Sequence, residues 1–111
     1  MVASSLAQEI SQLEADFCFA LSDPTRILIL YCLAEGARNV NQLTGELHIS
    51  QPTTSRHLKV LRERGLVHAV RQGTTVTYHL SDDRLIQALD LLRAVMRDRL
   101  AHRANLMETI S

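Results

Sequence analysis

Apolar side chains recur every three or four residues near the start of the chain, a spacing that places them on one face of a helix. The members of this stripe are Leu6, Ile10, Leu13, Phe17 and Leu21. They predict a helix over residues 4–21. A second helix is expected over residues 24–35, because Asp23 suits a capping position and Pro24 a first turn. This second helix is apolar nearly all round, so it is predicted to be the buried centre of the domain.

Residues 39–64 have the pattern of two helices joined by a tight turn. After the turn at residues 48–49, Ser50 can cap the second helix and Gly65 can end it. Apolar residues lie at helical spacing on both sides of the turn: Val40, Leu43, Leu47, Leu58 and Leu61. Both helices are therefore expected to pack on one core, as in a helix–turn–helix motif.

The pattern changes to strand-like runs over residues 66–80. Gln72-Gly73-Thr74 divides them, which predicts a hairpin. In the second run apolar and polar residues alternate, so one face is expected to be buried and the other wet. A last helix is expected over residues 82–109, with Ser81 as its cap. Its apolar stripe consists of Leu85, Leu89, Leu92, Met96 and Leu100.

The element order predicts a mainly α, winged helix–turn–helix fold (α-α-α-α-β-β-α) that forms one domain over residues 1–111. The core of so small a domain offers no obvious partner for the stripes of the first and last helices. We therefore expect these two helices to form a dimer interface. Packing of both helices within one chain is the alternative.

The chain is neutral, with 12 Lys and Arg against 12 Asp and Glu, but its charge is unevenly placed. Residues 1–49 carry six acidic and two basic side chains, whereas residues 50–80 carry five basic side chains and one acidic. A basic segment in a neutral protein is typical of a site for polyanions such as nucleic acid. Ordinary solvated helix charge is the alternative.

The composition also indicates a compartment. The longest apolar run, residues 27–34, is far too short to span a membrane, and the first residues do not resemble a secretory signal. Two cysteines, Cys18 and Cys32, do not make a disulfide framework. A cytoplasmic protein without a membrane partner is the simplest interpretation.

The start of the second motif helix has the side chains that read bases in a major groove. In such motifs this helix enters the groove with its N-terminal end first. The candidate base contacts are Gln51, Thr53, Thr54, Ser55, Arg56 and His57, and the capping residue Ser50 is included in the candidate DNA-binding surface. Gln pairs with adenine, Arg with guanine, and a Thr methyl packs on thymine. Lys59 and Arg62 are better placed for phosphates, and Arg71 with Thr74 for a wing contact. A polar turn that only starts a helix, and a hairpin that only closes the core, are the alternatives.

Three segments resemble the ArsR/SmtB repressors: 20-ALSDPTRILIL-30, 49-ISQPTTSRHLKVLRERGLV-67 and 71-RQGTTVTYHL-80. The resemblance covers about residues 6–100. It implies a dimeric winged-helix repressor of bacterial or archaeal type, in a family in which many members release operator DNA when a metal or another inducer binds. It further implies that residues 51–64 read the DNA, residues 66–80 form the wing, and the first and last helices form the dimer.

Several positions depart from the family pattern. His48 stands in the turn where a glycine is usual, and Thr74 stands where the wing commonly carries Arg or Lys. The family's metal ligands are also missing. Residues 39–42 contain no thiol, and the positions of a second metal site hold Asp82, Arg84, Val95 and Asp98. Without thiols or imidazoles, zinc would be held poorly. We therefore expect no metal cofactor of the family type.

These observations predict a homodimeric transcriptional repressor of a near-palindromic operator, released by an effector that the sequence does not identify. A repressor that switches through Cys18 and Cys32 is one alternative, although structural burial is the expected state of both thiols. A winged-helix module that binds protein is another. The histidines show no ligand spacing, and no enzyme signature is present.

Overall fold

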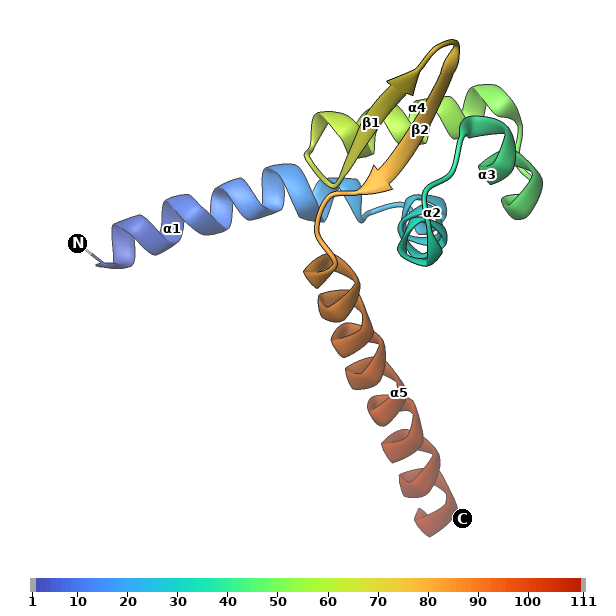
Figure 1. The fold of residues 1–111 in the computed structure, drawn as a ribbon. Helices are drawn as coiled ribbons and strands as arrows, with labels where there is room; N and C mark the ends of the chain where they lie inside the picture. The colour runs from blue at the N-terminus through green and yellow to red at the C-terminus, as the bar shows by residue number, and fades with distance from the viewer. Residues whose placement is uncertain (1, 111) are drawn as a thin grey trace.

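The computed structural model describes residues 2–110, and Figure 1 shows a small central body from which two long helices extend. The elements in chain order are α1 (Val2–Leu13), a π-helical turn (Glu14–Cys18), α2 (Pro24–Glu35), α3 (Val40–Leu47), α4 (Gln51–Glu63), β1 (Val67–Gln72), β2 (Thr75–Leu80) and α5 (Arg84–Ile110). This order and the two-stranded antiparallel sheet confirm the predicted winged helix–turn–helix fold.

Helix α2 supplies the centre of the core, as predicted, but one side of it is open, because Leu28 is 53% exposed. Its Ile29 and Leu30 are fully buried, and they belong to one cluster that joins α2 to α3, α4 and the start of the wing. The other fully buried apolar members are Ala20, Leu43, Leu58, Leu61 and Leu66. Burial of aliphatic side chains contributes roughly 1.5–3 kcal/mol each, so this cluster is the main reason why α3 and α4 keep one orientation.

Side chains cap the helices of the body. The Asp23 carboxylate accepts the N–H of Thr25 at 2.8 Å, and Pro24 occupies the first turn of α2, as predicted. Helix α3 begins with a capping box that was not predicted from the sequence. The side chain of Asn39 accepts the N–H of Gln42, and the Gln42 side chain accepts the N–H of Asn39.

The wing is a tight hairpin in which Gln72 pairs with Thr75, so its loop contains only Gly73 and Thr74. Gly73 has a φ of 64°, which glycine adopts without strain. The predicted alternation of buried and wet residues in β2 is wrong. Residues 76–80 are all half-buried. Tyr78 and Leu80 pack against the core, and on the other face His79 stacks on His68, with 5.1 Å between the ring centroids.

The two long helices differ at their ends from the prediction. The expected first helix contains the π-helical turn before its last residues, and α5 is preceded by Asp82 rather than by a Ser81 cap. The Asp82 carboxylate accepts the N–H of Arg84 at 2.9 Å, while the N–H of Ser81 donates to the carbonyl of Leu66. A carboxylate in this place also favours the positive end of the helix.

Both arms present apolar side chains to solvent. About half or more of each of the following is exposed: Leu6, Ile10 and Leu13 on α1, and Leu91, Leu92, Val95, Met96, Leu100 and Met107 on α5. Among residues 2–110, no helix has the length and apolar character needed to cross a membrane.

Candidate DNA-binding surface

A pair of threonines joins the two helices of the motif. Thr54 of α4 is fully buried; its hydroxyl donates to the carbonyl of Ser50 at 2.9 Å and accepts from the hydroxyl of Thr44 on α3 at 3.1 Å. The prediction that Thr54 contacts a base is therefore wrong. Its side chain faces the core, and its role is to hold α3 and α4 together.

The turn between these helices has a left-handed backbone at His48. His48 has a φ of 55° and is the one non-glycine residue between positions 2 and 110 with a positive φ. Its N–H bonds to the carbonyl of Thr44, which closes the end of α3. Ser50 then caps α4 by accepting the N–H of Thr53, as predicted. The motif thus keeps its geometry although the usual glycine is replaced.

The outer side of α4 carries the predicted polar side chains. Those that are exposed are Gln51, Ser55, Arg56, Lys59 and Arg62. Thr53 is half-buried, and its hydroxyl oxygen lies 2.8 Å from that of Ser50 and 3.2 Å from Nη2 of Arg56. This small network holds the guanidinium of Arg56 at the N-terminal end of the helix. An Arg that is already oriented loses less conformational entropy when it pairs with a guanine.

His57 lies at the edge of this surface and not fully upon it. The ring is half-buried, and its Nδ1 atom lies 3.4 Å from Nη1 of Arg26. Burial lowers the pKa of His57, the Asp23 carboxylate opposes that change, and the guanidinium groups of Arg26 and Arg56 add to it. His57 is therefore neutral near pH 7, so it adds a hydrogen-bonding group but no charge to the candidate surface.

The residues expected to contact phosphate lie further along α4 and on the wing. Lys59 and Arg62 are exposed, with Glu63 at 4.0 Å from the Lys59 ammonium. Arg71 and Thr74 are exposed at the wing tip. A cleft of about 270 Å³ separates this tip from the motif; it is lined by Asn39, Val40, Asn41, Gln51, Thr74, Thr75 and Val76. The polar ends of α3, α4 and the wing therefore border one concave surface.

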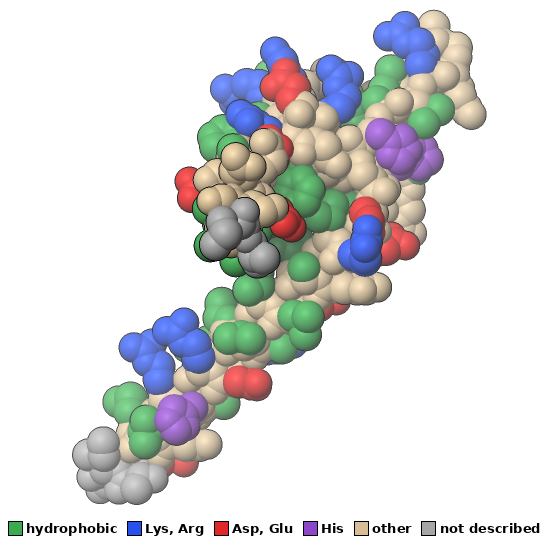
Figure 2. Space-filling model, turned by 90° about the vertical axis from the view of Figure 1, so that its left-hand side faces the viewer, with side chains coloured by type: hydrophobic (Ala, Val, Ile, Leu, Met, Phe, Trp, Pro, Cys, Tyr) green, Lys and Arg blue, Asp and Glu red, His purple; other side chains and the backbone are tan. Residues whose placement is uncertain are grey.

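The charged side chains are also unevenly distributed between the elements. Figure 2 shows Lys and Arg side chains on the central body and also on α5, where they alternate with green apolar side chains. The basic excess of residues 50–80 lies on the part that holds the motif and the wing. A surface with hydrogen-bonding groups in front of cations suits a duplex, in which base edges lie between phosphates.

Comparison with known proteins agrees with this geometry. A model of the family described as "Bacterial regulatory protein, arsR family" matches residues 23–69, which contain α2, the motif and the start of the wing. An uncharacterised HTH-type transcriptional regulator of Methanocaldococcus jannaschii is 40% identical over 79 residues, which cover 70% of this chain and 89% of that relative. The chain belongs to the ArsR family of bacterial regulatory proteins. It is thus a DNA-binding transcriptional regulator and not an enzyme.

Two further ArsR-type proteins resemble the chain. The HTH-type transcriptional repressor SmtB of Mycobacterium tuberculosis is 40% identical over 78 residues, which cover 70% of this chain and 58% of that protein. The homodimeric winged helix–turn–helix DNA-binding domain Mb0332 of Mycobacterium bovis, a possible ArsR-family regulator, superposes with a TM-score of 0.70 at 27% identity, covering 90% of this chain and 89% of that domain. The likeness therefore extends from the motif to the helical arms.

The positions that correspond to a metal site in the ArsR family hold an ion pair here. Arg84 donates to both oxygens of Asp82, with 2.7 Å between Nη2 and Oδ2, and these bonds lower the pKa of Asp82 to about 2. The carboxylate already has a cationic partner. Among the residues that the structure describes, no three His, Cys, Asp or Glu side chains converge as metal ligands would.

The two cysteines lie in different environments. Cys18 is exposed, so the expectation that it is buried in the protomer is wrong; it ends the π-helical turn, where the helix faces solvent. Cys32 is half-buried on α2. Burial raises the pKa of the Cys32 thiol, and the neighbouring carboxylates of Glu46 and Glu35 raise it further. Cys32 is therefore a poor nucleophile, because the thiolate is the reactive form.

Three residues near the motif were missed from the sequence. Arg26 is only 9% exposed, and it bonds to the end of the N-terminal helix and approaches His57. Phe19 and Arg64 join the same group. One signal was available, because an arginine within an otherwise apolar helix must find partners when it is buried. The partners themselves come from distant parts of the chain, so the sequence could not name them.

Proposed function

We propose that this ArsR-family protein is a homodimeric transcriptional repressor that places one α4 helix per protomer in the major groove of a near-palindromic operator. The observation that carries the proposal is the oriented row of polar side chains on α4. Gln51, Ser55 and Arg56 are exposed at its N-terminal end, and Arg56 is held by Thr53. Because the motif inserts this end of the helix, these side chains are the ones that would meet base edges.

In this proposal Lys59, Arg62 and Arg71 contact phosphates, and Thr74 brings the wing tip near the backbone. Their exposure on the basic part of the molecule supports that role. Phosphate contacts hold the protein in register and make binding dependent on salt, but they do not select bases. Ser50 and Thr53 support the base-reading residues from the cap of α4, and His57 flanks them.

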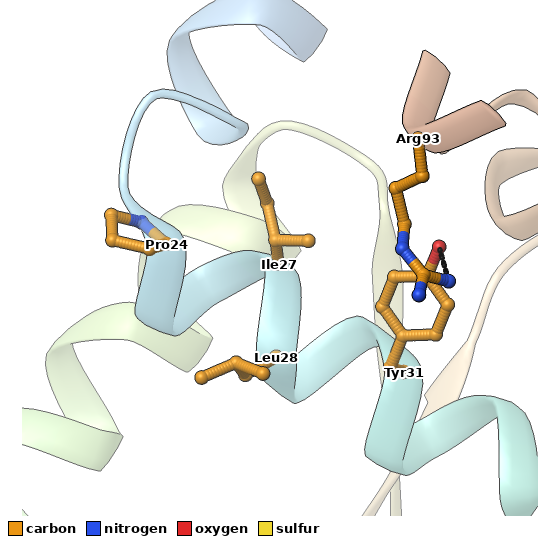
Figure 3. Close-up of a pocket in the computed structure, with 5 residues that line it drawn as sticks. All are labelled: Pro24, Ile27, Leu28, Tyr31 and Arg93. Carbon is orange, nitrogen blue, oxygen red and sulfur yellow. Dashed lines mark hydrogen bonds between the residues drawn. The ribbon is translucent and has the colours of Figure 1, made fainter. Parts of the chain in front are cut away.

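The dimer is proposed from the apolar side chains that the protomer leaves uncovered. On α1 they border a hollow of about 430 Å³ that includes Leu6, Ile10 and Leu13. A second hollow, of about 410 Å³, lies between α2 and α5. Figure 3 shows it, with Ile27 and Leu28 beside Tyr31 and the guanidinium of Arg93 over the tyrosine ring. Exposed apolar patches of this kind are typical of protein–protein interfaces. Because the similar domain Mb0332 is a homodimer, a second copy of this chain is the partner that we propose.

Release from DNA is proposed to follow from an effector that does not use the family's metal positions. The Asp82 carboxylate is bonded to Arg84, and the thiol-free segment at the start of α3 is occupied by its own capping box. Neither place offers a thiol or an imidazole, which are the ligands that thiophilic and borderline metals prefer. The effectors proposed instead are small molecules and thiol reagents. Cys18 is the accessible thiol with which such reagents would react.

Selection of bound duplexes from a random pool tests the proposed function. We expect enrichment of two inverted half-sites separated by about one helical turn, with affinity that falls as salt rises. Enrichment of a single half-site would contradict the dimer, and absence of any enriched sequence would contradict the repressor. The selected duplex then permits a screen for release by metal salts, thiol reagents and small molecules.

A further inference from the structure

Phe19, near the end of the N-terminal helix, lies beside two guanidinium groups that come from different helices. The Cζ atom of Arg26, on α2, is 5.7 Å from the centroid of the ring, and that of Arg64, at the end of α4, is 4.7 Å from it. Both distances are within the range of a cation–π interaction. The side chain of Phe19 therefore joins the N-terminal arm (α1 and the π-helical turn) to the central helix α2 and to α4, the helix proposed to read DNA and called the reading helix below.

Arg26 bonds to the C-terminal end of the N-terminal helix. Its Nε atom donates to the carbonyl of Ala20 at 2.7 Å, and Nη2 donates to the carbonyl of Phe19 at 3.1 Å. These are the last carbonyl groups of the helix, where the backbone dipole is negative and a cation is favoured. The same guanidinium reaches His57 on α4 at 3.4 Å. Because Arg26 is buried, these partners are needed to offset its desolvation.

Arg64 makes the second link, directly from the C-terminal cap of α4. Its Nη1 atom donates to the carbonyl of Ala15 at 3.2 Å and lies 3.5 Å from the Asp16 carboxylate. Ala15 and Asp16 belong to the π-helical turn. The contact thus joins a π-helical turn to the C-terminal cap of α4, where the N–H of Arg64 bonds to the carbonyl of Val60. π-Helical turns in proteins often occur at functional positions.

These links matter because of where α1 goes. Figure 1 shows α1 leaving the central body as an arm, and its apolar residues beyond the π-helical turn are exposed. The arm is attached at its base, by the apolar contacts of Phe17, Ala20 and Leu21 with the core and by the bonds of Arg26 and Arg64. Apolar contacts are not directional, whereas hydrogen bonds from a planar guanidinium are. The bonds of the two arginines therefore constrain the angle of the arm to α4.

We propose that Arg26 and Arg64 are positioning residues that set the spacing between the two operator half-sites. The inference rests on the proposed function, in which α1 belongs to the dimer interface and α4 reads DNA. If the angle between α1 and α4 is fixed in each protomer, the separation and rotation of the two reading helices are fixed as well. Each added base pair turns one half-site by about 35° relative to the other, so small changes of angle alter the preferred spacing.

The test measures binding to operators with altered spacing. The duplex selected by the wild-type protein is remade with one or two base pairs added or removed between the half-sites. For the wild type we expect affinity to fall at least about tenfold for each step away from the optimum. Arg64→Gln and Phe19→Leu are expected to flatten this profile to about threefold or less, or to move its optimum. Arg26→Ala would unfold the domain, because Arg26 is buried. Phe19→Leu is therefore used in its place: it removes the ring that both guanidinium groups contact and leaves the net charge unchanged.

Arg62→Gln is the matched control, because it removes the same charge from the same helix without touching the arm. It should weaken binding equally at every spacing. Uniform weakening by Arg64→Gln and Phe19→Leu as well, or an unchanged profile, would overturn the positioning role. A wild-type protein that binds one half-site as tightly as two contradicts the proposed dimer, and this inference with it. Arg64→Lys keeps the charge but not the planar fork, so it should resemble Arg64→Gln in profile and the wild type in salt dependence.

Discussion

Nδ1 of His57 on the reading helix lies 3.4 Å from Nη1 of the buried Arg26. Burial and the two nearby guanidinium groups lower the pKa of His57, with Asp23 opposing them. The unfolded chain therefore takes up a proton at this position more readily than the folded one, below the ordinary histidine pKa of about 6.5. Folding stability contributed by neutral His57 is present at pH 7 and is lost as the pH falls below about 6.5 and through the lower pKa of the folded state.

His57→Gln should reduce this pH dependence, since Gln cannot be protonated. Urea denaturation between pH 7.5 and 5 measures it: the wild type should lose more stability over that interval than the variant does. His102→Gln, on an exposed turn of α5, is the control and should keep the wild-type dependence. Equal slopes for wild type and His57→Gln would mean that His57 does not resist protonation in the fold.

Thr54→Val tests the corrected role of the buried threonine. The substitution keeps the shape of the side chain but removes the hydroxyl that links Ser50 and Thr44. We expect a loss of about 1–2 kcal/mol in the free energy of unfolding. Base preference, measured with the fully folded fraction, should not change. A changed preference at constant stability would return Thr54 to the reading surface.

Replacing each of two glycines by alanine should change the free energy of unfolding in opposite directions. Gly73 in the wing has a φ of 64°, whereas Gly45 lies within α3, and a methyl group at either place would meet no atom within 4 Å. Gly73→Ala should therefore cost about 1 kcal/mol through backbone strain alone. Gly45→Ala should stabilise by about 0.5–1 kcal/mol through helix propensity. Thermal unfolding of both variants measures this, and a stabilising Gly73→Ala would contradict the left-handed turn.

The proposed dimer depends on the exposed apolar face of α5. Met96→Glu places a charge where apolar side chains would be covered by the partner protomer, so it should raise the dissociation constant of the dimer at least about tenfold. Sedimentation equilibrium measures that constant. Gln87→Glu adds the same charge at an exposed polar position of α5 and should have little effect. A dimer that tolerates Met96→Glu would place the interface elsewhere.

Local signals explain why most of the fold could be predicted. Asp23 and Ser50 cap helices through atoms two or three residues away, and Gly73 forms its turn within the loop. Such features depend on neighbours in sequence, which pattern and propensity describe well.

The failures have the opposite cause. Thr54 was assigned to the DNA surface because its neighbours are polar, but its partner Thr44 lies on another helix. Arg64 was counted only as part of a basic segment, although it bonds to the arm 49 residues earlier. Exposure of Cys18 likewise follows from the direction in which α1 leaves the body. These relations are set by tertiary packing, which a single sequence does not specify at the level of atoms.

The central claim is that side chains at the N-terminal end of α4, such as Arg56, contact bases, whereas Lys59 and Arg62 further along the helix contact phosphates. Its most direct test compares Arg56→Ala with Lys59→Ala on the selected operator and on versions with single base-pair changes, at several salt concentrations. Arg56→Ala should reduce discrimination at one base pair of each half-site by roughly 1–3 kcal/mol. Lys59→Ala should weaken binding to all sequences alike and lower the salt slope by about one. Unchanged discrimination by Arg56→Ala at fixed salt would contradict the account.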